Sequence, residues 1–169
     1  MKKGTTNTAL IQQIKEAFAP VNKPYNHFGI YSARARDEYN DPTEEEQRLD
    51  RELDRYDLTP QQMHECSTSL IFLEPAGFHY YLPAYMILSL NEGNIKDKSL
   101  KASMVFSSAE DALSRADADY KIKQHQRLNR MQIEAVIEFL QYLNETKLAA
   151  KGFYAKAIGY WEEKLARLK

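Results

Sequence analysis

The residues best suited to chemistry stand close together in the middle of the chain. His64, Glu65 and Cys66 are adjacent, and Glu74 and His79 follow a few residues later. Side chains of these types can hold zinc or form a Cys–His nucleophile pair. Adjacent residues of a helix point about 100° apart, so the first three cannot converge on one ion, and no HExxH spacing is present. The sequence predicts a buried thiol and hydrogen-bonded imidazoles, with no catalytic residue, metal or other cofactor.

Several common kinds of site are excluded by what the chain lacks. Cys66 is the only cysteine, so neither an internal disulfide nor a cysteine cluster for a metal can form. The sequence has no DxDxDG loop, P-loop, GxSxG elbow or GxGxxG turn, which removes the usual calcium, nucleotide, hydrolase and dinucleotide sites. The first residues contain no apolar run of about 7–15 residues to act as a signal peptide. These absences predict a cytoplasmic protein.

Charge is distributed unevenly along the chain. The whole sequence has a net charge of −1, which creates no general attraction for nucleic acid. Residues 37–57 contain ten acidic residues against three arginines, a net charge of −7, while the first 36 residues carry a net charge of +5. Arg34 and Arg36, flanked by tyrosines, could stack against a single nucleic-acid strand. The adjacent acidic segment opposes this, so nucleic acid is not an expected partner.

The acidic segment supports a first functional hypothesis, binding to another protein. An acidic helix face is usually a solvated surface, but it can also steer a basic partner during encounter. The preceding segment, about 19–41, is too long for a simple connection and carries aromatic side chains suited to a contact surface. The residues that we expect to contact the partner are Tyr25, Phe28, Tyr31, Glu45, Glu46 and Asp50.

The stretch EPAGFHYYLPAYMILSL, residues 74–90, forms the apolar centre of the sequence. Together with the residues just before it, the stretch has the length of a membrane span. Glu74, His79 and two prolines interrupt it, and its flanks lack the basic asymmetry of a span, so we expect no membrane association. Apolar residues surround the whole helix predicted at about 75–91, which is typical of a buried helix.

Pro83 supports the alternative functional hypothesis. Inside the helix it removes a hydrogen bond to the carbonyl of His79 and should kink the chain there. A pocket at this kink would suit an enzyme or a small-ligand-binding protein. The side chains expected to line that pocket are Glu74, His79, Tyr80 and Tyr85.

Helix-capping patterns and apolar periodicity predict the remaining architecture. Capping patterns stand at Asp41, Thr59, Ser107 and Asn129, each before a helical period. The chain is therefore expected to form an all-α fold, a single compact domain over 1–169 around the kinked central helix, with an irregular aromatic and charged insert at about 19–57. The expected helices are 7–18, 42–57, 60–66, 75–91, 107–114, 131–144 and 151–167.

Four segments resemble a bacterial family of small helical domains of unknown function. FLEPAGFHYYLPAYM at 72–86 is similar to the FLxPxxFxYYLPAY block of that family, and IKEAF at 14–18 to its opening helix. LNRMQIEAVIEFLQYL at 128–143 and GYW at 159–161 resemble its C-terminal FLxYL helix and closing YW. The resemblance implies a helical fold and carries no activity or catalytic residue. The segment at 19–57 is longer than the family pattern leads us to expect.

These patterns favour a non-enzymatic cytoplasmic helical protein that binds another protein. An immunity- or antitoxin-type role is one concrete form, because small acidic proteins often neutralise basic enzymes. This step is an analogy and does not follow from the fold.

Overall fold

The computed structural model describes residues 7–24, 29–101, 107–114, 119–147 and 151–168. All regular secondary structure in these ranges is helical, which confirms the predicted all-α class. The helices are α1 (Asn7–Phe18), α2 (Ile30–Asp37), α3 (Glu44–Glu52), α4 (Pro60–Glu65), α5 (Ser69–Phe72), α6 (Pro75–Leu90), the 3₁₀ helix η1 (Glu92–Asn94), α7 (Lys98–Lys101), α8 (Ser108–Ala112), α9 (Asp119–His125), α10 (Arg130–Thr146) and α11 (Lys151–Arg167).

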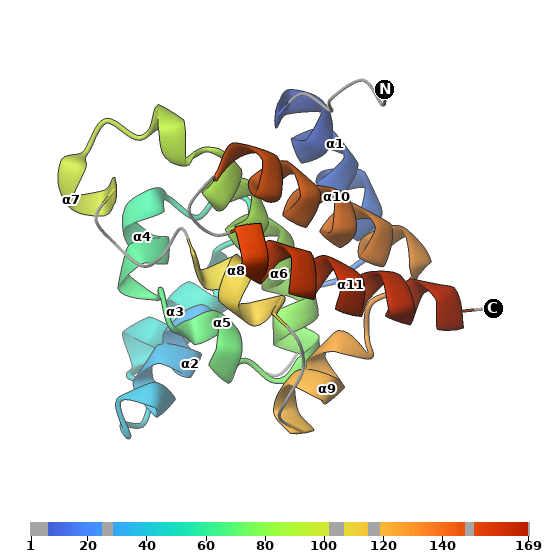
Figure 1. Ribbon diagram of the computed structural model, residues 1–169. Coiled ribbons are helices and arrows are strands. Elements are labelled where there is room, and N and C mark those ends of the chain that lie inside the picture. Colours follow the sequence, from blue (N-terminus) through green and yellow to red (C-terminus); the bar gives the residue numbers. More distant parts are fainter. Residues whose placement is uncertain (1–6, 25–28, 102–106, 115–118, 148–150, 169) are drawn as a thin grey trace.

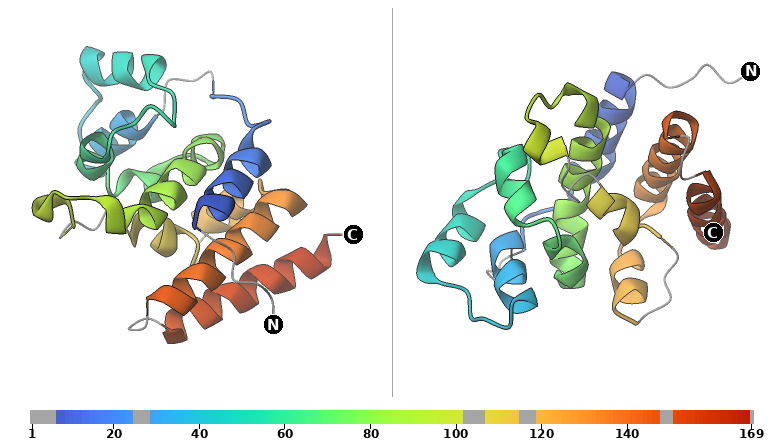
Figure 2. Two further views of the ribbon diagram at one scale, coloured as in Figure 1. Left: turned by 90° about the horizontal axis from the view of Figure 1, so that it is seen from above. Right: turned by 60° about the vertical axis from the view of Figure 1, so that its left-hand side comes forward.

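Helix α6 lies at the centre of the fold (Figure 1). Helices α1, α5, α8 and α9 pack against it. On one side, α10 packs against α1 and pairs along its length with α11; on the other side, α2 packs against α3 and α5 (Figure 2). The predicted central helix is thus enclosed by elements from both halves of the chain.

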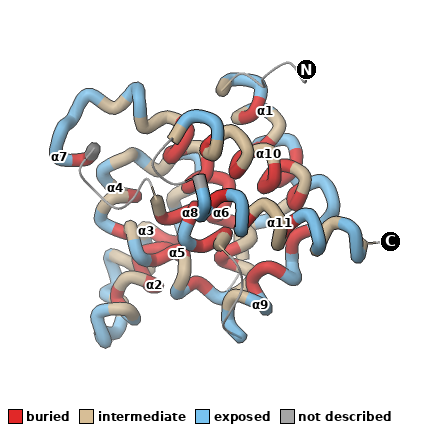
Figure 3. Tube along the Cα trace, viewed as in Figure 1, coloured by how far each residue is buried: buried red, intermediate tan, exposed pale blue. Residues whose placement is uncertain are grey.

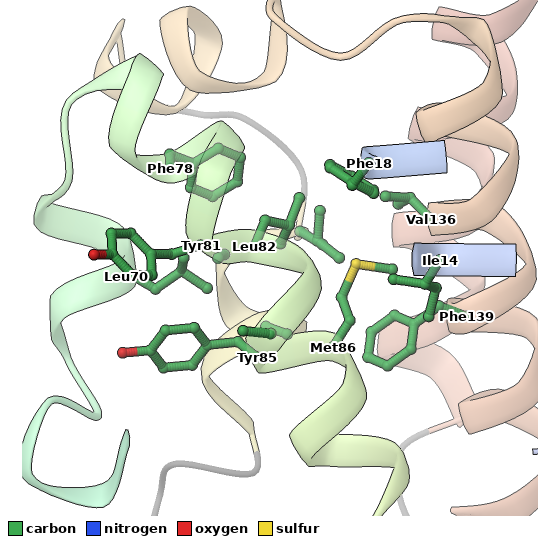
Figure 4. Packing of buried hydrophobic residues seen from close by; sticks show 14 of the residues in the cluster. Ile14, Phe18, Leu70, Phe78, Tyr81, Leu82, Tyr85, Met86, Val136 and Phe139 are labelled. Atoms are coloured by element: carbon green, nitrogen blue, oxygen red, sulfur yellow. The ribbon is translucent and has the colours of Figure 1, made fainter. Parts of the chain in front are cut away.

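The burial of α6 follows from its composition. Twelve of its sixteen residues are buried, because apolar side chains leave it on every side. In Figure 4, Met86 points toward Ile14 of α1 and Phe139 of α10, whereas Tyr81 and Tyr85 point toward Leu70 of α5. Burying each such side chain contributes about 1.5–3 kcal/mol. α6 therefore joins both sides of the fold into one hydrophobic core.

The two prolines of α6 have different effects on its hydrogen bonding. Pro75 occupies the first turn, where its missing N–H costs nothing. Pro83 stands inside the helix, which continues through it to Leu90. Because proline has no N–H, the carbonyl of His79 receives no helical hydrogen bond from residue 83.

The predicted capping patterns were correct at Thr59 and Asn129, where complete capping boxes open α4 and α10. The cap of α3 is Thr43 rather than the predicted Asp41, because the Glu46 carboxylate accepts the Thr43 amide at 2.8 Å and completes a box there. Ser107 occupies the N-cap of α8 but makes no side-chain cap bond. A capping pattern alone therefore locates a helix start to within about two residues.

The described part of the segment at 19–57 contains more helix than expected before residue 42 and less after it. The predicted loop at 19–41 contains α2, and five of the eight residues of that helix are buried. The predicted helix at 42–57 ends at Glu52, where the backbone becomes extended. Helices α5 and α9 were also not predicted. Figure 3 shows that exposure is concentrated at the α2–α3 connection, around α7 and at the end of α11.

Candidate functional site

Asp50, one of the predicted partner contacts, is an internal cap. Its carboxylate accepts hydrogen bonds from the backbone amides of Tyr31 (3.0 Å) and Ser32 (2.9 Å) and from the Ser32 hydroxyl (2.6 Å). These amides open α2, whose N-cap residue Gly29 has no side chain to accept them. Burial raises the pKa of Asp50, although the hydrogen bonds oppose the rise. Since only 3% of Asp50 is exposed, its predicted role as a partner contact is corrected.

The residue type at position 29 is restricted to glycine by the nearby Asp50 carboxylate. A Cβ atom at this position would lie 2.2 Å from Oδ1 of Asp50 and 2.8 Å from the hydroxyl of Tyr81. Any larger residue would push the carboxylate away from the helix that it caps. The absence of a side chain at Gly29 thus allows the close approach of α3 to the start of α2.

The other predicted partner contacts are divided between surface and interior. Tyr31 is buried, so it too cannot contact a partner. Glu46 is half-buried and pairs with Arg34 at 2.5 Å, and Glu45 is exposed and bound to Arg48. Tyr25 and Phe28 lie outside the described residues. Of the described members of the predicted surface, Glu45 and, in part, Glu46 remain accessible.

An acidic projection that the sequence did not single out lies at the α2–α3 connection. Tyr39 is 98% exposed and is the one described non-glycine residue with a positive φ, 58°. Its amide donates to the carbonyl of Arg36 (3.0 Å), and the Asn40 amide donates to Ala35 (2.8 Å). This is the Schellman pattern of a helix end, in which glycine usually takes the left-handed position. We call Tyr39 with the exposed acids around it, Glu38, Asp41, Glu44 and Glu45, the acidic tip.

The four residues of the alternative pocket do not meet. Nε2 of His79 donates to Gln132 at 2.8 Å, and burial lowers the pKa of His79. The Tyr80 hydroxyl donates to Asp54 at 2.7 Å, and the Tyr85 hydroxyl donates to the backbone of Cys66 at 2.7 Å. Glu74 is exposed at the start of α6. The predicted lining is corrected, because each side chain serves a different neighbour.

The candidate chemistry around Cys66 is also absent. Cys66 is fully buried, and burial raises the pKa of its thiol to about 12, so the nucleophilic thiolate does not form at neutral pH. Within the residues that the structure describes, no three His, Cys, Asp or Glu side chains lie together as a metal site would require. In the same part of the chain, no helix is long and apolar enough to cross a bilayer.

Two grooves lie on the surface near α6. The first has a volume of about 300 Å³ and runs along the C-terminal half of α6, where Ala84 and Ile87 face Lys15 and Arg55. It lies directly after Pro83, as the alternative hypothesis expected, but none of the four predicted residues lines it. The second has a volume of about 630 Å³ and is largely apolar, between the start of α6 and α9. Its lining residues include Phe72, Glu74, Pro75, Asp119, Tyr120 and Lys123.

A buried polar cluster joins α6, α8 and α11 at Glu110 of α8. Its Oε1 accepts hydrogen bonds from Ser89 of α6 (3.1 Å) and Lys147 (2.7 Å), and its Oε2 accepts one from the hydroxyl of Tyr154 of α11. Burial alone would lower the pKa of Lys147, but Glu110 and Glu92 together outweigh this effect and raise it. With every charge matched by a partner, the cluster is structural.

His125, at the end of α9, is the most perturbed imidazole. Its Nε2 donates to the carbonyl of Ala112 at 2.8 Å, which leaves Nδ1 to accept from the hydroxyl of Tyr160 at 3.1 Å. The ring packs against Trp161 with centroids 4.5 Å apart. Burial lowers the pKa of His125 to about 4. It is therefore a neutral core histidine, as the sequence predicted for imidazoles in general.

The fold defines the class of this protein: a small all-α domain built around an apolar central helix. Comparison with protein families shows that the chain belongs to a family of unknown function (DUF6714), whose model matches residues 6–165. The predicted membership of a family of domains of unknown function is thus confirmed, while the bacterial origin stays a prediction. Neither the curated proteins nor the solved structures gave a match to this chain.

Proposed function

We propose that this protein is a non-enzymatic domain that binds a basic protein partner through the acidic tip. The observation that carries the proposal is Tyr39, a fully exposed aromatic residue held in the left-handed conformation. That conformation costs a non-glycine residue about 1–2 kcal/mol. Strain of this kind, at a position where glycine would fit without it, points to a function for the side chain.

Tyrosine is suited to a contact of this kind. Its large ring and hydroxyl make it one of the residues that most often dominate protein interfaces. The α2–α3 connection, to which Tyr39 belongs, extends from the body of the molecule at the lower left of Figure 1 and is largely exposed in Figure 3. A side chain that is 98% exposed is free to enter a pocket on a partner.

The charge around Tyr39 favours a basic partner. Residues 37–46 contain six acids and no base. Among the described residues, no basic side chain lies within ion-pair distance of Glu38, Asp41 or Glu44, whereas Glu45 and Glu46 are paired. Three exposed carboxylates around an aromatic side chain would attract a basic surface and accelerate encounter with it. Neutralisation of a basic enzyme, as by an immunity- or antitoxin-type protein, is one form of this function.

A photo-crosslinking experiment tests the proposal. A benzophenone amino acid placed at position 39 of the full chain should crosslink, in cells of the source organism, to a protein with a basic surface. The matched control places the same group at position 131. Met131 of α10 is 60% exposed and is distant from position 39 in the sequence. Adding excess unlabelled wild-type protein should abolish the position-39 product.

The variants that decide the outcome change the tip and leave the fold intact. Excess Tyr39→Ala protein, or a Glu38→Lys, Asp41→Lys, Glu44→Lys triple variant, should fail to compete for the crosslinked partner. If these variants compete as well as the wild type, or if position 131 yields the same product, the acidic tip is not the binding surface.

A further inference from the structure

The smaller groove beside α6 combines apolar walls with positive charge at one end. Leu58, Met63, Ile87 and Ile95 line it with aliphatic surface, and its volume is about 300 Å³. Since one water occupies about 30 Å³ of liquid, this volume holds on the order of ten non-hydrogen atoms. Small-molecule sites have the same character, with apolar walls and a few polar groups that orient the ligand.

Arg55 supplies a buried positive charge to this groove. Only 5% of the residue is exposed. Its guanidinium donates to the backbone carbonyls of Phe18 (2.9 Å), Val21 (3.2 Å) and Tyr80 (3.3 Å). These acceptors are neutral, and no carboxylate of the described residues lies within ion-pair distance of Arg55, although Asp54 interacts with it at longer range. A buried arginine without a direct ion pair is unusual.

One donor of Arg55 remains unused. Its Nε is buried and has no hydrogen-bond partner among the described residues. Asp54, the preceding residue in the chain, accepts hydrogen bonds from the Tyr56 amide (3.0 Å) and the Tyr80 hydroxyl (2.7 Å) instead. A buried N–H without an acceptor carries a cost that an arriving anion would remove.

Lys15 adds a second positive charge at the rim. Its Nζ lies 5.4 Å from the centroid of the Tyr56 ring, and the Arg55 guanidinium lies 4.9 Å from the same centroid. Both cations therefore lie near the same ring, and all three residues line the groove. Two cationic side chains can bind the two oxygens of one carboxylate through charge-assisted hydrogen bonds.

We propose that this groove binds a medium-chain monocarboxylate, with the carboxylate between Lys15 and Arg55 and the aliphatic chain against Met63, Ile87 and Ile95. The site is separate from the acidic tip, and the inference does not depend on the proposed protein partner. Octanoate has ten non-hydrogen atoms and fits the size of the groove, so it is the probe of choice.

Titration of the full-length protein with sodium octanoate, followed by methyl NMR, tests the site. Saturable shifts are expected at the methyl groups of Met63, Ile87 and Ile95. Octan-1-ol, which has the same chain without charge, should bind about tenfold more weakly or worse, because it cannot form charge-assisted hydrogen bonds. Butyrate, which has the charge with a short chain, should also bind more weakly.

Two variants and one control locate the bound probe. Lys15→Gln changes an exposed residue and should weaken octanoate binding about tenfold, and Ile87→Trp should fill the groove and abolish binding. The matched control, Lys123→Gln, removes the cation of the larger groove at α9 and should leave binding unchanged. The inference would be overturned if no saturable shifts appeared, or if octanol bound as tightly as octanoate. It would also be overturned if octyl phosphate bound more tightly than octanoate, or if Lys15→Gln left the affinity for octanoate unchanged.

Discussion

The α2–α3 pair and the central helix α6 bury their side chains by different means. α6 is apolar on every side and is held by contacts that have little directional requirement. α2 and α3 are joined by directed polar contacts: the Asp50 carboxylate accepts three hydrogen bonds from the start of α2, and Glu46 pairs with Arg34. The difference teaches that a helix as polar as α3 can be attached to a fold through a few directed polar contacts, while the rest of its surface stays available for charge.

The largest expected effect lies on the α6 side of this comparison. Phe78→Ala removes a fully buried ring and should lower the free energy of unfolding by about 3–5 kcal/mol, because a cavity remains. Phe72→Ala, six residues earlier and 47% exposed, should change it by less than about 0.5 kcal/mol. Urea denaturation of both variants measures the contrast, and equal losses would contradict the described core.

The free energy of unfolding should depend on pH through His125, which packs near Phe78 of α6. Burial lowers the pKa of His125 from 6.5 to about 4, so between these pH values the unfolded chain takes up a proton that the folded chain does not. The stability contributed by the neutral imidazole is complete above about pH 6.5 and is lost as the pH falls toward 4, by about 3 kcal/mol in total. Lys121 and Lys164 act in the same direction.

The measurement compares wild type with His125→Gln, which does not titrate, by urea denaturation at pH 7 and pH 4.5. The stability advantage of the wild type at pH 7 should shrink at the lower pH. A constant difference between the two proteins would show that His125 titrates normally in the fold.

On the α2–α3 side, Asp50→Ala should lower the free energy of unfolding by about 1–3 kcal/mol. The reason is that the amides of Tyr31 and Ser32 lose their buried acceptor. Glu44→Ala, in the exposed first turn of the same helix, is the control and should change stability by less than about 0.5 kcal/mol. If both changes cost the same, Asp50 does not cap α2.

The smallest effect is expected at Tyr39 and has the opposite sign. Tyr39→Gly relieves about 1–2 kcal/mol of left-handed strain but adds backbone entropy to the unfolded chain that costs about 0.5–1 kcal/mol. Thermal unfolding should therefore show a stabilisation of about 0.5 kcal/mol. If the variant is more stable and yet binds its partner less well, Tyr39 serves binding rather than folding. If the variant is less stable, the backbone at Tyr39 is not strained and the proposal loses its main support.

The sequence predicted α6 from its continuous apolar composition, α10 from its apolar period and capping box, and α11 from its apolar period, because these signals are local. It failed at α2, whose residues IYSARARD have no clear period and are buried only because α3 and α5 pack on them. The partner surface was misjudged at Asp50 for a related reason. Nothing near Asp50 in the sequence distinguishes a carboxylate that caps a distant helix from one that faces water.

Two other features were beyond sequence reasoning because they depend on three-dimensional placement. Tyr39 was recognised as one of several aromatic residues, but its backbone conformation appears only once α2 is known to end beside it. Arg55 was counted as one charge in an acidic segment. Its role at the groove depends on contacts with α1 and α6, which lie 37 and 25 residues away in the sequence.

The close contact of Gly29 with Asp50 has an evolutionary consequence. A side chain at position 29 and a carboxylate at position 50 exclude each other in space, so neither position can change freely while the other is kept. Among relatives of this chain, glycine at the first position should accompany an acid at the second. Where the glycine is replaced, we expect the acid to be lost as well, and a Ser, Thr, Asp or Asn at the start of α2 to supply the cap locally.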